Sequence, residues 1–184
     1  QAAQLLQAGR LAEAESLLQA HLREDRRSPD AQNLLGLVEL QRGDAAAALP
    51  RFRKLVRRHP GDPHAHCNLG LALKLRGDLA DARAAFETAL RRRPGFTDAL
   101  FNLAVTLQDM EAWAEAMDAY TRVLEQAPGH YKAAFNLGVL HKRMGDTGAA
   151  EAAFRRALEG QPLLADAWWN LAGCRRFVER DEAA

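Results

Sequence analysis

Four asparagines recur at intervals of 34 residues, and their side chains can hold a polypeptide through hydrogen bonds. They are Asn68, Asn102, Asn136 and Asn170. A carboxamide both donates and accepts hydrogen bonds, so such a column can bind the backbone of an extended peptide regardless of its sequence. In the preceding interval Leu34 interrupts the column, and Asn33 lies one place out of register. The chemistry that this column predicts is reversible recognition of a peptide backbone.

Apolar side chains accompany the asparagine column at fixed offsets, where they would select the side chains of a bound peptide. An aliphatic column contains Leu37, Leu71, Val105 and Val139, and an edge column contains Cys67, Phe101, Phe135 and Trp169. Lys132 lies four residues before Asn136, on the same helical face. We therefore predict a peptide-binding site formed by Asn68, Asn102, Asn136, Asn170, Leu71, Val105, Val139, Phe101, Phe135 and Lys132.

Catalytic and metal-binding chemistry has no comparable pattern in the sequence. There is no Gly-x-Gly-x-x-Gly motif, no phosphate loop containing lysine, no His-Glu-x-x-His and no Gly-x-Ser-x-Gly. His64 and His66 would point about 200° apart on a helix, and His64 with Cys67 would supply only two ligands, so we expect no metal site there. We expect no catalytic residue, no metal and no cofactor, and a chain that is not itself an enzyme.

The composition is that of a foldable chain with balanced charge. The 184 residues are 48% hydrophobic, 27% charged and 7% aromatic, and the net charge is +1. This balance argues against a nucleic-acid partner and against a membrane surface, and no apolar run approaches the roughly 18 residues that span a bilayer. Cys67 and Cys174 form no disulfide or metal-binding pattern, which indicates a reducing, cytoplasmic location.

The 34-residue period includes further columns and divides the chain into repeats. An alanine column contains Ala48, Ala82, Ala116 and Ala150, and an aromatic column contains Phe52, Phe86, Tyr120 and Phe154. A proline column contains Pro60, Pro94, Pro128 and Pro162. Whole units therefore cover residues 29–62, 63–96, 97–130 and 131–164, with partial units at 1–28 and 165–184. We expect the chain to be a fragment of a longer protein.

Each unit is predicted to form two helices separated by a turn. Apolar residues recur at spacings of three and four on both sides of a Gly-Asp or Gly-Arg break. In Gly77-Asp78, glycine allows the positive φ that ends the first helix, and aspartate would cap the second helix. Pro94-Gly95 then ends the second helix. Pro50 lies within a second helix, which it is expected to bend or locally distort.

These columns resemble the tetratricopeptide repeat, whose pattern is Leu-Gly, a glycine turn, Ala-x-x-x-Phe and a proline. The second whole unit has all of these residues, namely Leu69, Gly70, Gly77, Ala82, Phe86 and Pro94. The resemblance extends over essentially the whole chain, with departures at the turn glycine, which is replaced by Glu111 and Glu179. It implies an all-α fold in which helix-turn-helix repeats stack into a right-handed superhelical solenoid. The first helices would line a concave groove, with the asparagine column on its floor.

Three interpretations of the asparagine column remain open. Asparagine is frequent at this place in tetratricopeptide repeats, where it would bond a neighbouring helix rather than a ligand. The column also resembles the asparagine ladder inside the superhelix of O-GlcNAc transferases, which holds acceptor polypeptides. Lys132, Asn136 and Asn170 match part of the carboxylate clamp of chaperone-binding repeat proteins, although Asp98 and Asp166 would repel a carboxylate.

The expected function is that of a protein-interaction scaffold that binds an extended peptide or partner segment in this groove. The rival interpretation is a substrate-recruiting arm of a larger transferase whose catalytic domain lies beyond residue 184. That enzyme would be a glycosyltransferase like the O-GlcNAc transferases or a sulfotransferase. Residues 170–172 and 175–177 with Asp181 resemble the junction in bacterial proteins that join tetratricopeptide repeats to a sulfotransferase domain.

Two further surface features lead to predictions about association. At the two ends, Leu5, Leu6 and Leu11, and Trp168, Leu171 and Phe177, would be uncovered, which predicts end-to-end self-association. Basic clusters lie toward the end of the second helix in several units, at residues 57–58, 91–93 and 155–156. Cations there oppose the negative end of the helix dipole, so we expect a structural role for these clusters rather than a polyanion-binding one.

Overall fold

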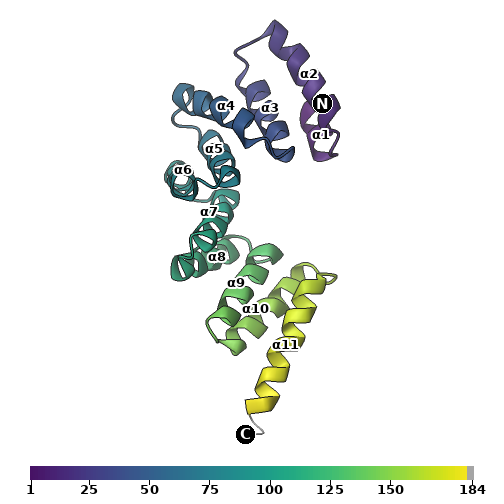
Figure 1. The fold of residues 1–184 in the computed structure, drawn as a ribbon, viewed down its shortest axis with the longest axis vertical. Helices are drawn as coiled ribbons and strands as arrows, with labels where there is room; N and C mark the ends of the chain where they lie inside the picture. The colour runs from purple at the N-terminus through teal and green to yellow at the C-terminus, as the bar shows by residue number, and fades with distance from the viewer. Residues whose placement is uncertain (182–184) are drawn as a thin grey trace. The chain divides into compact units, whose positions relative to one another are not determined.

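The computed structural model describes the backbone of residues 1–181 and the side chains of residues 1–174, and the described backbone consists of helices joined by short turns (Figure 1). The helices are α1 (Ala2–Gln7), α2 (Leu11–Glu24), α3 (Pro29–Gln41), α4 (Ala45–Arg58), α5 (Pro63–Arg76), α6 (Leu79–Arg92), α7 (Thr97–Asp109), α8 (Trp113–Gln126), α9 (Tyr131–Arg143), α10 (Thr147–Gly160) and α11 (Ala165–Asp181). No strand occurs among residues 1–181, so the all-α prediction is confirmed. Each predicted whole unit contains two helices, beginning with α3 and α4 in residues 29–62.

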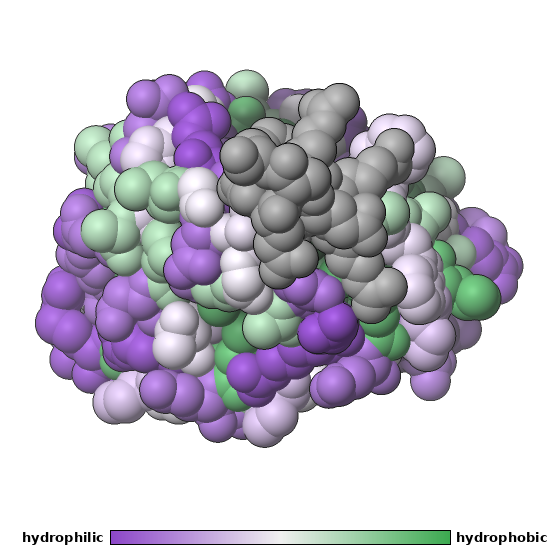
Figure 2. All heavy atoms as spheres, turned by 90° about the horizontal axis from the view of Figure 1, so that it is seen from below, coloured by the Kyte–Doolittle hydropathy of each residue, from purple (hydrophilic) through white to green (hydrophobic). Residues whose placement is uncertain are grey.

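The helices form two compact units, Gln1–Ala99 and Leu100–Ala184, and each is described by itself. In the first unit every helix from α1 to α5 packs on the next helix in the sequence, and α3 also packs on α5. In the second unit α8 packs on α9, α9 on α10, and α10 on α11. Contacts between sequence neighbours are typical of repeat proteins, in which each repeat is stabilised by the adjacent ones. On the face shown in Figure 2, hydrophobic side chains are interspersed with hydrophilic ones.

The two helices of a repeat meet where a glycine of the first helix faces an aromatic ring of the second. A Cβ atom at Gly70 would lie 2.7 Å from a ring carbon of Phe86. The same pairs recur as Gly36 with Phe52 and Gly138 with Phe154. All three rings are fully buried. The two helix faces therefore pack directly on each other, and only glycine permits so close an approach.

A left-handed turn ends each first helix that a second helix follows. Gly9, Gly43, Gly77 and Gly145 have φ angles between 72° and 89°, and Glu111 adopts the same region with φ 59°. The residue after each of these donates its N–H to a carbonyl five residues back; for example, Ala112 N lies 2.9 Å from Leu107 O. This hydrogen bond satisfies a carbonyl that the helix end would leave unpaired. The replacement of glycine by Glu111 therefore leaves the turn unchanged.

The start of the second helix is capped by aspartate in two repeats but not in the one used for the prediction. Asp44 and Asp146 each accept a hydrogen bond of 2.9 Å, from the N–H of Ala47 and Ala149 respectively. The prediction that Asp78 caps α6 is wrong, because its carboxylate pairs with Arg76 instead. The positively charged Arg76, two residues earlier, competes with the backbone N–H groups of α6 for the Asp78 carboxylate.

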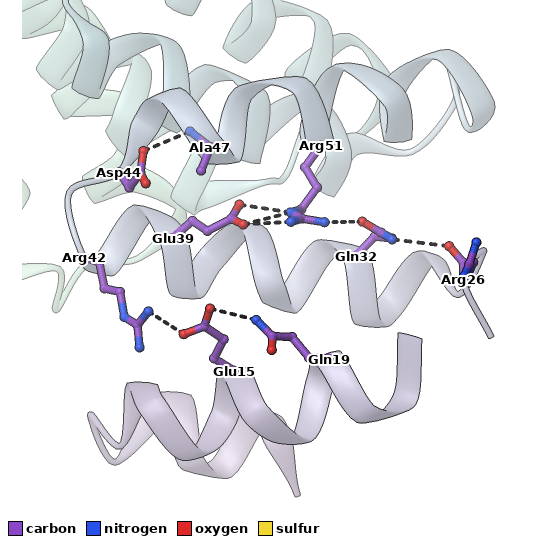
Figure 3. Close-up of polar contacts among 9 residues, drawn as sticks. All are labelled: Glu15, Gln19, Arg26, Gln32, Glu39, Arg42, Asp44, Ala47 and Arg51. Carbon is purple, nitrogen blue, oxygen red and sulfur yellow. Dashed lines mark hydrogen bonds and ion pairs between the residues drawn. The ribbon is translucent and has the colours of Figure 1, made fainter. Parts of the chain in front are cut away.

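Helix α4 is continuous through Pro50 and is held to its neighbours by polar contacts. Pro50 and Ala46 are both exposed, so the Ala46 carbonyl, which would bond an N–H at position 50, lies on the solvent side of the helix. Arg51 of α4 donates to Glu39 of α3 at 3.0 and 2.8 Å, and to Gln32 at 2.6 Å (Figure 3). Arg42, directly after α3, forms an ion pair with Glu15 of α2 (Figure 3).

The expected exposure of apolar side chains at both ends needs correction. Leu6 is buried, and Leu5 and Leu11 are partly buried against a cluster that includes Ala14 and Leu18 of α2. At the other end Leu171 is buried, whereas Trp168 is exposed. Phe177 lies outside the described side chains. The N-terminal leucines are covered because α2 and α3 both pack on α1.

We expect Glu111→Gly to raise the free energy of unfolding by about 0.5 to 1 kcal/mol. A left-handed backbone conformation costs a residue with a Cβ atom about 1 to 2 kcal/mol of stability, and glycine avoids this cost. The greater freedom of glycine in the unfolded chain offsets part of the stabilisation. The measurement is the midpoint of urea unfolding, followed by helical circular dichroism. Glu125→Gly, at an exposed position of α8, is the matched control and should lower stability by about 1 kcal/mol. A lower midpoint for Glu111→Gly would contradict the prediction.

Candidate peptide-binding groove

In the first unit the first helices of successive repeats form an apolar pocket of about 560 Å³. Its lining residues are Leu6 of α1, Leu37, Leu40 and Gln41 of α3, and Leu71, Lys74 and Leu75 of α5. The structure thus brings predicted residue Leu71 together with Leu37, its equivalent in the preceding repeat. Leu75 is 51% exposed, so the pocket is open to solvent at this side chain. A volume of this size is within the range that holds a small ligand or a large side chain.

A carboxamide pair lies next to this pocket along the same two helices. Asn68 Nδ2 donates to Asn33 Oδ1 at 2.7 Å, which joins α5 to α3. Asn33 and Asn68 precede Leu37 and Leu71 by about one helical turn, so each asparagine shares a helix face with its leucine. This bond uses one donor of Asn68 and one acceptor site of Asn33, and each carboxamide can form further hydrogen bonds.

The sequence pattern does not predict several residues of the pocket and of the carboxamide pair beside it. Asn33 lies one place out of the 34-residue register, yet it bonds the asparagine of the next repeat. Leu75 follows Asn68 by seven residues, a spacing that puts both on one helix face, and this signal was present in the sequence. Leu6 is expected at an uncovered end, because the partial first repeat does not reveal that α1 packs on α3.

In the second unit the predicted asparagine Asn136 belongs to a partly buried chain of polar groups. Asn136 Nδ2 donates to Tyr120 Oη at 3.0 Å, and Tyr120 Oη donates to Gln108 Oε1 at 2.9 Å. The chain joins α9, α8 and α7. Burial raises the pKa of the Tyr120 phenol, and the hydrogen bond from Asn136 acts in the opposite direction. The hydroxyl therefore remains protonated and serves as the donor to Gln108.

The remaining asparagines also have partners within the chain. Asn170 Nδ2 donates to the backbone carbonyl of Asp166 at 2.8 Å, and Asn170 Oδ1 accepts from Lys142 Nζ at 2.9 Å. The backbone carbonyl of Asn102 accepts from the buried Thr106 hydroxyl at 2.7 Å. The bond from Lys142 joins α9 to α11, as expected if the asparagine bonds a neighbouring helix, whereas the other two bonds lie within one helix. Because a carboxamide has several donor and acceptor sites, the bonds of Asn170 leave capacity for a ligand.

The predicted aromatic residues of the edge column pack within the second unit. The ring of Phe101 lies 6.0 Å from that of Tyr120 and 4.7 Å from that of His130. The ring of Phe135 lies 5.7 Å from that of Phe154. Both Phe101 and Phe135 are half-buried, so each ring has an exposed part in addition to its packing role.

Three other predicted residues occupy the surfaces of α7 and α9. Val105 and Val139 are half-buried, and Lys132 is exposed. The Nζ atom of Lys132 lies 6.0 Å from the centre of the Tyr131 ring, at the limit of a cation–π contact. Lys132 is therefore held near the N-terminus of α9.

Cys67 and its neighbouring histidines have structural contacts. Burial raises the pKa of the Cys67 thiol to about 12, and the negative charge of Asp98 adds to this shift. The thiol is therefore protonated and unreactive at neutral pH. The His64 ring packs on Phe96 at 4.8 Å, and the His66 ring lies 3.0 Å from the carbonyl oxygen of Pro60.

Two kinds of site are not found in the part of the chain that the structure describes. No group of three or more histidine, cysteine, aspartate or glutamate side chains is arranged to hold a metal ion there. Nor is any described helix both long and apolar enough to cross a membrane. The side chains of residues 175–177 and Asp181, which carried the resemblance to a sulfotransferase junction, lie outside the described side chains.

The geometry defines an α-helical repeat protein built from helix pairs. Family models described as "Tetratricopeptide repeat" match residues 1–63, 34–95, 73–137 and 107–173. The chain belongs to the tetratricopeptide repeat family. This fold is consistent with a protein-interaction scaffold and is typically non-catalytic.

Solved structures share the fold at low sequence identity. TTC0263, a thermophilic protein of this family in Thermus thermophilus, is 22% identical with a TM-score of 0.78, and the match covers 94% of each chain. PilF of Pseudomonas aeruginosa is 19% identical with a TM-score of 0.85, covering 98% of this chain and 82% of the other. YrrB, described as having an unusual peptide-binding site, is 23% identical with a TM-score of 0.70, and the match covers 91% of this chain and 86% of the other. None of the curated proteins compared with the chain matches it.

We expect Tyr120→Phe to lower the free energy of unfolding by about 1 kcal/mol. The change removes the hydroxyl that joins Gln108 and Asn136, and a lost hydrogen bond of this kind typically costs about that much. Tyr131→Phe, on the half-buried surface of α9, is the control and should change stability little. Urea unfolding of the three proteins at pH 7 provides the measurement.

The pH dependence of the same pair gives a second readout. A phenol whose pKa is raised by folding stabilises the protein fully below its ordinary value of about 10, and this contribution is lost as the pH rises above that value. The stability difference between the parent and Tyr120→Phe should therefore shrink above about pH 10. A difference that grows with pH would show that Tyr120 is not buried in its neutral form.

Proposed function

We propose that this protein is an interaction scaffold that binds an extended peptide segment of a partner protein along its first helices. The observation that carries the proposal is the leucine-lined pocket beside the Asn33–Asn68 pair. An apolar pocket provides a place for a large side chain, and the carboxamides next to it can bond the peptide backbone. The family supports a role in protein interaction, and YrrB, whose description mentions a peptide-binding site, supports it through its shared fold.

The expected ligand is a peptide with a large aliphatic side chain. The lining of the pocket consists mainly of leucines, which favour burial of apolar area over specific polar contacts. Backbone amides of the same peptide would form hydrogen bonds with the remaining carboxamide donor and acceptor sites of Asn68 and Asn33. In the second unit the proposal extends to Asn102, Asn136, Asn170, Val105 and Val139, with Phe101, Phe135 and Lys132 at the edge.

The proposal is tested by selecting random peptides displayed on phage against the immobilised chain. Selected peptides should share an aliphatic residue and should bind Leu75→Asp at least about tenfold more weakly, because a carboxylate would replace apolar contact area at the pocket. Leu17→Asp is the matched control, since Leu17 is an exposed leucine of α2 outside the pocket lining. Circular dichroism checks that both variants remain folded.

Asn68→Ala separates the two parts of the site. If the carboxamide bonds the peptide backbone, this variant should weaken binding of all selected peptides by a similar factor, whatever their sequence. Peptides that lack a common aliphatic residue, or that bind Leu75→Asp as well as the parent, would contradict groove binding at this pocket.

Self-association is the second part of the proposal, and one end of the chain supports it. Trp169 is 75% exposed and Trp168 is 56% exposed, and with Leu163 of the preceding loop they line an open apolar pocket of about 560 Å³. Exposed apolar surface of this kind favours association. The N-terminal leucines do not contribute in the way predicted from the sequence, because they are covered.

Sedimentation velocity at increasing concentration measures this association. The parent should show a rising average sedimentation coefficient, and Trp169→Ser should remain monomeric at the same concentrations. Met144→Ser is the control, because Met144 is also exposed but is not part of the pocket lining. A parent that stays monomeric at high concentration would rule out association through α11.

A further inference from the structure

Helix α4 differs in charge from the other second helices of the whole repeats. Its residues from Ala45 to Arg58 include five basic side chains, Arg51, Arg53, Lys54, Arg57 and Arg58, and no acidic one. Helices α6, α8 and α10 each contain both signs of charge. Residues 1–99 as a whole contain 16 Lys and Arg against 12 Asp and Glu, whereas residues 100–184 contain 9 against 12. The basic excess of the first unit is therefore concentrated on α4.

Most of these cations have no acidic partner. Arg51 is neutralised by its ion pair with Glu39 at 2.8 Å. Lys54, Arg57 and Arg58 are exposed and form no ion pair among the described residues. Like charges on adjacent turns of one helix repel each other, so anions that approach the exposed cations of α4 reduce this repulsion. We call the surface formed by these cations the basic face of α4.

Two of these cations lie at a small notch between α4 and the start of α3, where Arg27, Pro29 and Gln32 form the other wall. Lys54 and Arg58 are four residues apart on one face of α4, and they line the notch together with Arg27 and His59. The notch measures about 10 Å³, which has room for about one water-sized group. It can therefore receive a single atom such as one carboxylate oxygen, while the rest of that group would remain at the surface beside the cations.

A hydrogen-bond chain fixes the geometry of this notch. Arg51 donates to Gln32 Oε1 at 2.6 Å, and Gln32 Nε2 donates to the carbonyl of Arg26 at 3.3 Å (Figure 3). The Arg51–Glu39 ion pair lies at the other end of the chain (Figure 3). These contacts hold the segment that carries Arg27 against α4. The backbone on both sides of the notch is thus held in place before any ligand binds, which reduces the entropy lost on binding.

We infer that the basic face of α4 is a second docking surface, which binds a short acidic segment of a partner protein through Lys54, Arg58, Arg27 and His59. A carboxylate oxygen of aspartate or glutamate would enter the notch, and the carboxylate would bond the surrounding cations. From Arg51 to Arg58 the face extends for about 10 Å along the helix, the length of a few peptide residues. The surface is separate from the groove of the first helices, so the partner can occupy either one alone.

A short acidic peptide fits this surface better than a nucleic acid. Electrostatic attraction acts over about 8 Å at physiological salt, and a short segment needs only the charges of α4. Tight binding of a nucleic acid needs several phosphate contacts over a longer basic surface. The excess of acidic residues in positions 100–184 offers no such extension.

Helix-end electrostatics explain only part of the basic cluster. Arg57 and Arg58 have equivalents in the next repeat at Arg91 and Arg92, where cations near a helix C-terminus oppose its dipole. Lys54 has no such equivalent in α6, because Thr88 takes its place there. Arg53 corresponds to Glu87, which forms an ion pair with Arg83. Arg122 of α8 and Arg156 of α10 do take the place of Lys54, but Arg122 pairs with Asp118 and Arg156 donates to the backbone carbonyls of Pro128 and Leu124. What distinguishes α4 is that its cation at this place has no such partner.

Fluorescence anisotropy with a labelled oligo-glutamate peptide tests the docking surface on the full 184-residue chain. The parent should bind the peptide, and the dissociation constant should rise as salt is increased from about 0.05 to about 0.3 M. Lys54→Gln combined with Arg58→Gln should weaken binding by about fivefold or more, since two exposed charge contacts are lost. Circular dichroism checks that the variant is folded, as expected for changes at exposed side chains.

The matched control is Arg91→Gln combined with Arg92→Gln. It removes the same charge from the corresponding end of α6, and binding should change by less than about twofold. Equal weakening by the two double variants would mean that only net charge matters and would overturn the inference. So would the absence of oligo-glutamate binding by the parent. Tighter binding of a labelled single-stranded DNA of similar charge, lost in the α4 variant alone, would reassign the surface to nucleic acid.

Discussion

The close contact between a glycine and an aromatic ring sets the position of the other side chains in three of the repeats. At Gly70 the backbone of α5 approaches Phe86 so closely that a Cβ atom would lie 2.7 Å from the ring. This contact fixes the rotation of the first helix about its own axis. Asn68 precedes Gly70 by two residues, or about 200°, so its side chain points away from α6. Leu71 follows on the same outer surface, and the leucine pocket is therefore a consequence of how the core packs.

The third repeat solves the same packing problem with different residues. Ala104 and Tyr120 take the places of the glycine and the phenylalanine, and both are fully buried. The tyrosine adds a hydroxyl, which a buried site tolerates only with hydrogen-bond partners. Gln108 and Asn136 provide them. Asn136 thus supports a core residue of its unit, whereas Asn68 bonds another asparagine beside an apolar pocket. One column of the repeat pattern therefore serves two different structural purposes.

The first unit presents apolar and basic surfaces on different helices. First helices α1, α3 and α5 form the leucine pocket, and second helix α4 carries the unpaired cations. Local packing makes this separation possible, because each helix has one face against its neighbours and another face toward solvent. A partner with an aliphatic anchor and an acidic segment could contact both surfaces, and each contact would add to the specificity of the other.

The sequence by itself determined the family and the two helices of each whole repeat, because these depend on the residue type at each place of a 34-residue period. It also indicated the left-handed turns, although Glu111 shows that the turn persists without glycine where the helix-end hydrogen bonds are kept. Only the tertiary structure decided which side chains share a site. Asn33 bonds Asn68 across two helices despite its shifted register, Leu6 joins the pocket although it lies near the chain end, and Asp78 pairs with Arg76 instead of capping α6. A repeat pattern describes each residue by its place within one unit, whereas these contacts depend on the distance between side chains of different helices or on competition between nearby charges.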